Sequence, residues 1–257
     1  MSQYTLPFSE LSNDDVTRVG GKNASLGEMF SELTAEGIAI PDGFATTADA
    51  YRSFLDENNL KEEISDLLDE LDKENFKNLK DIGSKIRKKV MDAEIHEDFA
   101  EAIKKAYDDL EERTENLSGV AVRSSATAED LPEASFAGQH ESYMNITDKE
   151  ELVHTVKRCF ASLFTDRAIK YREDHGFEHM KVALSAGVQK MVRSDKGAAG
   201  VAFTIEPDTG FEEVIFINGS WGLGENVVGG VVQGDEFYVY KRNLENEGNP
   251  VLSKEIG

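Results

Sequence analysis

Residues 119–123 read Gly119-Val120-Ala121-Val122-Arg123, and this short run separates two kinds of sequence pattern. Its β-branched apolar residues, placed after a glycine, predict a buried strand that ends at the arginine. Before the run, apolar residues recur at helical spacing, and after it strand patterns dominate. Helices followed by strands, without strict alternation, predict an α+β fold.

The helical region before the run spans about residues 48–117. Its apolar residues form three stripes at helical spacing, made of Leu60, Ile64, Leu67, Leu68 and Leu71, of Ile82, Ile86 and Val90, and of Phe99, Ala102, Ile103, Ala106 and Leu110. Charged residues fill the other faces. We therefore expect helices that pack on a core and carry no chemistry.

After the run, the pattern predicts a loop, a helix and a set of strands. The polar stretch from Ser124 to about Gln139 is expected to be a loop. A helix is expected to begin near Thr147, which has capping-box spacing with Glu150, and to continue toward Tyr171. The strand candidates are 182–192, 200–205, 213–218 and 237–241.

The charge of the chain limits its partners. The 50 acidic and 28 basic residues leave a formal net charge of -22. Because nucleic acid and anionic membrane surfaces would repel such a chain, neither is predicted as a partner. Any anionic ligand must be held by a few local cations and backbone amides. A single cysteine, Cys159, in an apolar run and the lack of a signal-peptide pattern predict a buried thiol and a cytoplasmic protein.

The first candidate for chemistry is Gly20-Gly21-Lys22, directly before a predicted helix. Glycines let backbone amides approach a phosphate, and a helix N-terminus favours an anion. Lys22 would add a mobile positive charge. The spacing is not that of a P-loop. A structural Gly-Gly turn with an exposed lysine is the alternative.

The second candidate is Arg123. A guanidinium is a planar fork of donors that matches phosphate oxygens, and at the end of a buried strand its charge is costly unless it is paired. The hydroxyls that follow, together with residues 135–139, have the small and polar composition of a flap over a ligand. The alternative is a salt bridge from Arg123 to Glu129 or Asp130 beside an ordinary surface loop.

A third candidate lies at the end of a predicted strand, where alternation places Gln189 and Met191 on one face. Methionine suits a flat purine, and glutamine can hydrogen-bond the edge of one. A plain strand with a core methionine is the alternative. In the glycine-rich stretch 222–230, Glu225 could meet a ribose or a metal, or face water, and the Rossmann spacing is not met. No histidine has zinc-site spacing, so no metal ligand is predicted.

Taken together and in this order, six segments make the chain resemble the phosphoenolpyruvate synthases. They are GGKNASLGEM at 20–29, IPDGFATTADAYRSFL at 40–55, VRSSATAEDLPEASFAGQHESYMN at 122–145, SLFTDRAIKYR at 162–172, VALSAGVQKMVRSD at 182–195 and SWGLGENVVGG at 220–230. The resemblance covers essentially the whole chain. It implies an ATP-grasp-like nucleotide-binding domain, incomplete at its C-terminus, that spans 1–257 with a helical insert at 48–117.

The resemblance also implies roles for individual residues. Lys22 and Arg123 would hold the phosphates of ATP. The flap over them would include Thr127, Ser135, Gly138 and Gln139. Gln189, Met191 and Val192 would line the adenine pocket, and Glu225 would lie near the ribose. ATP and Mg²⁺ are the implied ligands, with no metal ligand assigned in this chain.

In the family that the chain resembles, ATP gives its two terminal phosphates to a histidine on another domain and becomes AMP. Water then removes one phosphate, and the histidine carries the other to pyruvate on a third domain, giving phosphoenolpyruvate. The implied partners are these two domains, and a homodimer is an option for the full-length protein. Residues 1–257 alone are expected to bind ATP weakly at best and to make no phosphoenolpyruvate. Two alternatives stay open: the front domain of pyruvate phosphate dikinase or rifampicin phosphotransferase, and a non-catalytic nucleotide-binding module.

Overall fold

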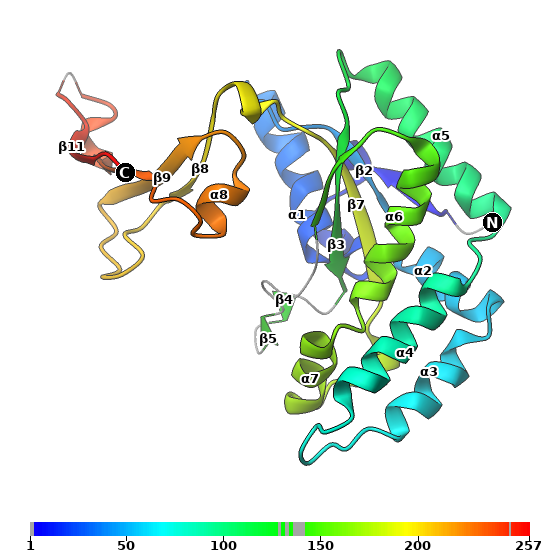
Figure 1. The fold of residues 1–257 in the computed structure, drawn as a ribbon. Helices are drawn as coiled ribbons and strands as arrows, with labels where there is room; N and C mark the ends of the chain where they lie inside the picture. The colour runs from blue at the N-terminus through cyan, green and yellow to red at the C-terminus, as the bar shows by residue number, and fades with distance from the viewer. Residues whose placement is uncertain (1–2, 128–129, 132–133, 136–141, 247) are drawn as a thin grey trace. The chain divides into compact units, whose positions relative to one another are not determined.

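The computed structural model describes residues 3–127, 130–131, 134–135, 142–246 and 248–257 (Figure 1). The chain forms two compact units, Met1–Met191 and Val192–Gly257. Both are built on antiparallel sheets, and the first also contains the long helices, so the predicted α+β class is confirmed. Within the described ranges, no helix has the length and apolar character needed to cross a membrane.

The first unit is built on a five-stranded antiparallel sheet with the order β1-β2-β7-β3-β6. The strands are β1 (Thr5–Pro7), β2 (Gly43–Thr46), β3 (Val120–Ala126), β6 (Ser142–Ile146) and β7 (Leu184–Lys190). The central strands β3 and β7 pair along seven residues. A short hairpin, β4 (Asp130–Leu131) and β5 (Ala134–Ser135), follows β3.

The predicted end of the central strand was wrong. β3 continues through Ser124, Ser125 and Ala126, so Arg123 is its fourth residue and not its last. Both serines are buried, and their backbones pair with β7. They belong to the strand because this pairing satisfies backbone N–H and C=O groups that would otherwise be buried without hydrogen-bond partners. Composition alone predicted a loop because serine is common in loops.

Four helices lie between β2 and β3. They are α2 (Ala48–Glu57), α3 (Leu60–Asp69), α4 (Leu79–Asp92) and α5 (Glu97–Arg113). The predicted stripe residues Ile64, Ile86 and Ile103 have no exposed surface, as expected for amphipathic helices on a core.

The helix after β6 differs from the prediction at both ends. α6 covers Lys149–Ser162, and Asp148 caps it by accepting the Glu151 N–H at 2.8 Å, so the proposed capping by Thr147 and Glu150 was wrong. The helix then stops, because Thr165 caps a separate helix, α7 (Asp166–Asp174). Cys159, in the middle of α6, is fully buried as predicted.

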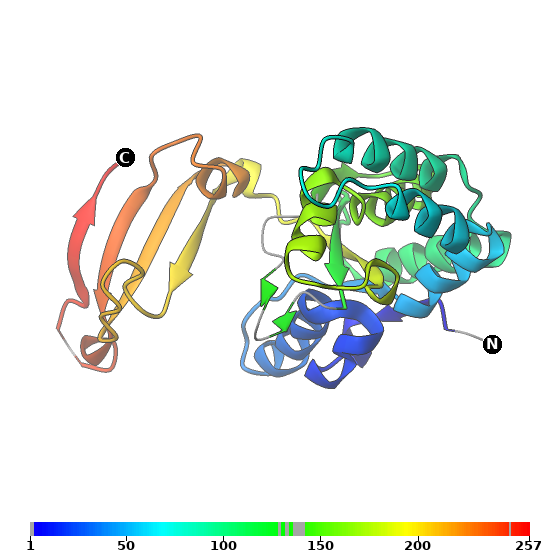
Figure 2. The same cartoon turned by 90° about the horizontal axis from the view of Figure 1, so that it is seen from below.

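The sheet of the first unit has a different covering on each face. Helix α1 (Val16–Ala35) lies on one face, and α6 lies on the other together with the α2–α5 helices (Figures 1 and 2). The larger core is on the α6 face. At its centre the ring of Phe160 lies 5.1 Å from Tyr51, 5.4 Å from Phe54 and 6.2 Å from Phe99, measured between ring centroids.

Helix α7 contributes a buried cluster of charged groups. Arg172 has no exposed surface, and its Nε donates to Nδ1 of His179 at 2.8 Å. Since Nδ1 accepts, the ring proton is on Nε2, which donates to Glu173 at 2.7 Å. Burial and the charge of Arg172 lower the pKa of His179 below its ordinary value of 6.5.

This cluster predicts a loss of stability in weak acid. A histidine whose folded-state pKa is lowered stabilises the fold fully above about pH 6.5, and that contribution is lost as the pH falls toward the folded value, because the unfolded chain then binds the extra proton. We expect the free energy of unfolding to fall less steeply below pH 6.5 in His179→Gln than in the wild type. Glutamine can keep both hydrogen bonds without titrating. Urea unfolding at a series of pH values tests this, and parallel curves for the two proteins would contradict it.

The second unit is a four-stranded antiparallel sheet with the order β11-β10-β9-β8. Its elements are β8 (Ala198–Phe203), β9 (Val214–Trp221), a short helix α8 (Glu225–Val228), β10 (Asp235–Tyr240) and β11 (Val251–Glu255). Figure 2 shows its strands side by side. Three of them overlap predicted strands, whereas β11 was not predicted. Among the described residues of this unit, Val214 is the only buried apolar side chain.

Candidate functional site

A glycine breaks helix α1 near its start. Gly20 has φ 76° and ψ 160°, outside the helical region, so the main part of the helix begins at Gly21 after a first turn at 16–19. A Cβ on Gly20 would lie 2.3 Å from Oγ and 2.6 Å from the carbonyl oxygen of Ser125. Both the positive φ and this close approach require glycine. The helix predicted to follow the glycine pair therefore does begin there, one residue earlier than predicted, and a separate turn at 16–19 precedes it.

Asn23 holds the first turn after this break against the sheet. Its N–H faces the Ser125 hydroxyl at 3.4 Å, and its Nδ2 donates to Ser185 on β7 at 2.8 Å. A Cβ on Gly187 would lie only 2.1 Å from the Asn23 side-chain oxygen. Sequence reasoning missed Asn23. The signal was a polar residue at a buried position of an otherwise amphipathic helix.

Arg123 lies on the same face of the sheet as the start of α1. Side chains two apart along a strand share a face, so Arg123 points to the side on which Ser125 meets Asn23. Arg123 is the only exposed residue of β3, and Lys22 is exposed in the first turn after the helix break. None of the described side chains pairs with Arg123. Its alternative partners, Glu129 and Asp130, lie outside the side chains that the structure describes.

Gln189 also belongs to this face, because it lies two residues after Gly187 on β7. Its Nε2 donates to the carbonyl oxygen of Pro41 at 3.0 Å. Met191 comes just after the strand, where its N–H bonds to Gly119 at 3.0 Å and its sulfur accepts the N–H of Asn145 at 3.0 Å. Both Gln189 and Met191 are partly exposed.

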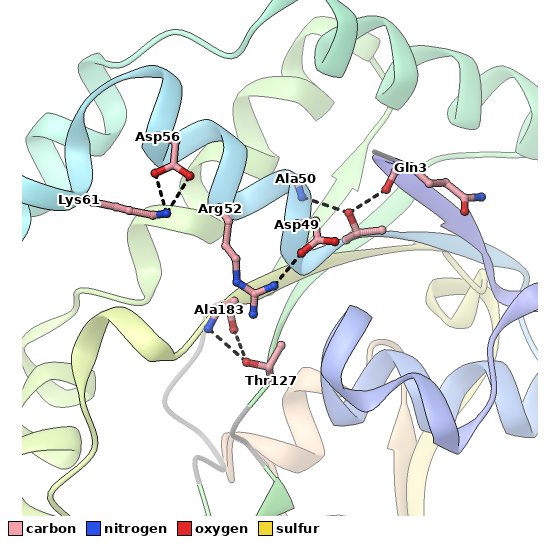
Figure 3. A network of polar contacts seen from close by, with 9 residues as sticks. Gln3, Asp49, Ala50, Arg52, Asp56, Lys61, Thr127 and Ala183 are labelled. Carbon is pink, nitrogen blue, oxygen red and sulfur yellow. Dashed lines mark hydrogen bonds and ion pairs between the residues drawn. The ribbon is translucent and has the colours of Figure 1, made fainter. Parts of the chain in front are cut away.

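Thr127 directly follows β3, and its hydroxyl is engaged with the main chain. The hydroxyl accepts the N–H of Ala183 at 3.2 Å and faces the Ala183 carbonyl oxygen at 3.3 Å (Figure 3). Thr127 therefore joins the end of β3 to the start of β7. Of the other predicted flap residues, Ser135 is described through its backbone, which pairs with Asp130. Gly138 and Gln139 lie outside the described residues.

The remaining predicted residues belong to the second unit. Val192 is its first residue, with 62 % of its surface exposed, and Glu225 is the exposed first residue of α8. The structure thus brings Lys22, Arg123 and Gln189 to one face of the sheet in the first unit. Val192 and Glu225 belong to the second unit. In the described part of the chain, no group of three or more His, Cys, Asp or Glu residues could hold a metal ion.

The chain belongs to a family of nucleotide-binding domains. The family model described as "Pyruvate phosphate dikinase, AMP/ATP-binding domain" matches residues 16–257. The glycines and cations of this face led us to expect a ligand that carries phosphates, and a domain described as binding AMP or ATP agrees with that expectation.

Within this class, the chain is similar to phosphoenolpyruvate synthases. It is 51 % identical to the Helicobacter pylori phosphoenolpyruvate synthase over 99 % of its own length and 32 % of the relative. The corresponding values for the Escherichia coli phosphoenolpyruvate synthase are 48 %, 100 % and 32 %. For the probable phosphoenolpyruvate synthase of Methanocaldococcus jannaschii they are 49 %, 96 % and 20 %. The resemblance predicted from the motifs is confirmed, and the chain spans about a third or less of the length of these relatives.

Proposed function

We propose that this chain is the part of a phosphoenolpyruvate synthase that binds ATP, in an ATP-grasp-like manner, and presents its two terminal phosphates for transfer to a histidine on another domain, which leaves AMP. Water would then remove one phosphate, and the histidine would pass the other to pyruvate, giving phosphoenolpyruvate. The identity of about half of all residues to phosphoenolpyruvate synthases favours this activity over that of rifampicin phosphotransferase. By itself, a chain of residues 1–257 would complete only the nucleotide-binding step.

One observation supports the proposal most directly. Arg123 is the single exposed residue of a buried central strand, and it faces the side on which the main part of α1 begins after Gly20. The N-terminal end of a helix favours an anion, and Lys22 is in its first turn. A guanidinium fork, an ammonium group and a helix start on one face suit a polyphosphate, which the net charge of -22 would otherwise repel.

In phosphoryl transfer, these residues would hold the phosphates in place and neutralise their negative charge. Phosphoryl transfer depends mainly on holding the phosphates in line and on neutralising the charge that develops on their oxygens. Arg123 would donate two parallel hydrogen bonds to one phosphate. Lys22 would place a positive charge on a flexible side chain beside a second phosphate. Neither residue would need to accept or donate a proton.

Gln189 would recognise the base, with Met191 and Val192 beside it. Because Nε2 of Gln189 donates to Pro41, its carboxamide oxygen remains as the acceptor. An acceptor at this position suits the exocyclic amino group of adenine and not the oxygen of guanine. Glu225 would contact the ribose, and Thr127, Ser135, Gly138 and Gln139 would belong to the segment that covers the phosphates.

Magnesium would enter with the nucleotide. Mg²⁺ is commonly bound by one or two carboxylates together with substrate phosphates. The ion would neutralise phosphate charge.

The test is a titration of the chain with ATP and Mg²⁺, followed by NMR so that millimolar affinities can be measured. We expect Lys22→Ala and Arg123→Lys each to raise the dissociation constant about tenfold or more, because one charge-assisted contact is worth roughly 1.5–3 kcal/mol. The lysine at position 123 retains the charge and loses the fork.

Lys61→Ala is the matched control, because Lys61 is an exposed lysine paired with Asp56 at 2.6 Å (Figure 3). It removes the same charge and should leave ATP binding unchanged. Wild-type affinity in Arg123→Lys would refute the bidentate contact. Equal losses in Lys22→Ala and Lys61→Ala would refute a specific role for Lys22.

A further inference from the structure

A cation-rich cavity lies on the opposite side of the sheet from Arg123, and the residues that line it come from α4, α6, β6 and the start of α7. Figure 1 labels the three helices. Its volume is about 560 Å³, which falls in the range of small-molecule sites. Arg87, Arg158 and Arg167 line it, three of the ten arginines in the chain. In a chain with 50 acidic and 28 basic residues, this concentration of arginine is unusual.

The cavity is separate from the proposed ATP site. Tyr143 lines the cavity from β6 and pairs with Val122 of β3, so both side chains share a face. Val122 is buried in the core that α6 covers. Its neighbour Arg123 points to the other face, toward α1. A ligand in this cavity would therefore not touch Lys22 or Arg123.

The described residues that line the cavity include more basic than acidic side chains. Among the described residues that line it, Asp166 is the only carboxylate, and it already pairs with Arg87 at 2.9 Å. Arg158, in contrast, pairs with none of the described carboxylates. His154 and the hydroxyl of Thr165 also line the cavity and can donate hydrogen bonds to an anion.

Two of the arginines are held in place before any ligand arrives. Arg87 donates to the carbonyl oxygen of Phe164 at 2.7 Å in addition to its contact with Asp166. The guanidinium of Arg158 lies 4.1 Å from the ring centroid of Tyr143. A guanidinium stacked on an aromatic ring still has its in-plane donors available. Pre-organised donors lose less entropy when a ligand binds.

We infer that this cavity binds the phosphate group of a small phosphorylated organic molecule. Phosphate is the anion that guanidinium forks and hydroxyl donors match in geometry and charge. The apolar side chains of Met91 and Ala161, which also line the cavity, would contact the organic part of the ligand. The site is independent of the nucleotide proposed for the other face.

The experiment is an NMR titration of the isotope-labelled 257-residue chain with phenyl phosphate at constant sodium concentration. The expected result is a set of shifts in the Nε–H signals of Arg87 and Arg158 and at the start of α7. Arg158→Gln should weaken binding by about fivefold or more, because it removes one fork. Lys22→Ala should leave the affinity unchanged. The NMR spectrum of each variant also reports whether it is folded.

Arg52→Gln is the control, since Arg52 is an exposed arginine of the same unit, paired with Asp49 at 2.8 Å (Figure 3). If Arg52→Gln and Arg158→Gln weaken binding equally, the effect is general charge and the proposal fails. Absence of shifts in the cavity residues would also overturn it. A parallel titration with inorganic phosphate separates the two sources of the group: equal affinities would overturn an organic ligand, and tighter binding of phenyl phosphate supports it.

Discussion

Replacing Gly20 by alanine is expected to destabilise the first unit by about 2–5 kcal/mol and to remove most ATP binding. A residue with a Cβ is strained at φ 76°, at a cost of roughly 1–2 kcal/mol. The new methyl group would also lie 2.6 Å from the carbonyl oxygen of Ser125, which is main chain and cannot rotate away. Relieving this contact would cost about a further 1–3 kcal/mol. It would move the first turn of α1, and with it Lys22, away from β3.

Gly37→Ala is the matched control for this prediction. Gly37 has φ 83°, but a Cβ there would meet no atom within 4 Å, so only the backbone strain applies. Urea unfolding followed by helical circular dichroism reports on the first unit, because α1–α7 all belong to it. If both variants lose the same stability, the contact between Gly20 and Ser125 is not sterically required. If Gly20→Ala binds ATP like the wild type, the position of α1 does not control the site.

Replacing Phe160 by alanine is expected to cost about 3–5 kcal/mol of stability. Phe160 has no exposed surface and contacts the rings of Tyr51, Phe54 and Phe99, which come from α2 and α5. Its removal would leave a void that these rings cannot fill without changing rotamer. Since α6 also carries Arg158, we expect phosphate binding in the cation-rich cavity to weaken together with the fold.

Phe211→Ala is the control for the same chemical change. Phe211 is 52 % exposed and belongs to the second unit, so its truncation should cost much less than that of a buried phenylalanine. The same circular dichroism measurement compares the two variants. Similar losses of stability would show that the aromatic cluster around Phe160 does not hold the first unit together.

Gly20→Ala and Phe160→Ala act on opposite faces of one sheet, so each tests the binding proposed for its own face. Gly20 sets the position of α1 on the face with Arg123, while Phe160 secures α6 on the face with Tyr143. A change in ATP binding without a change in phosphate binding, or the reverse, would show that the two faces function separately.

Several strands could not be predicted, because their existence depends on a partner far away in the sequence. β6 is a five-residue edge strand that lies in a stretch expected to be irregular, and it forms because β3 offers it a row of unpaired backbone groups. β11 forms at the edge of the second sheet for the same reason. The cap of α6 was also misplaced by one residue, since Thr147 and Asp148 are both suitable cap residues and only the backbone geometry selects one.

The amino-acid sequence by itself determined the α+β class, the helical stripes in residues 48–117, the buried Cys159 and the family. These features follow from local periodicity, composition and motif order, which need no knowledge of distant contacts. Only the tertiary structure decided which candidate residues share a face, and that the Thr127 hydroxyl is engaged with Ala183. The physical reason is visible in Asn23 and Ser125, which are 102 positions apart. Their contact places Lys22 on the face of Arg123, and no local pattern encodes it.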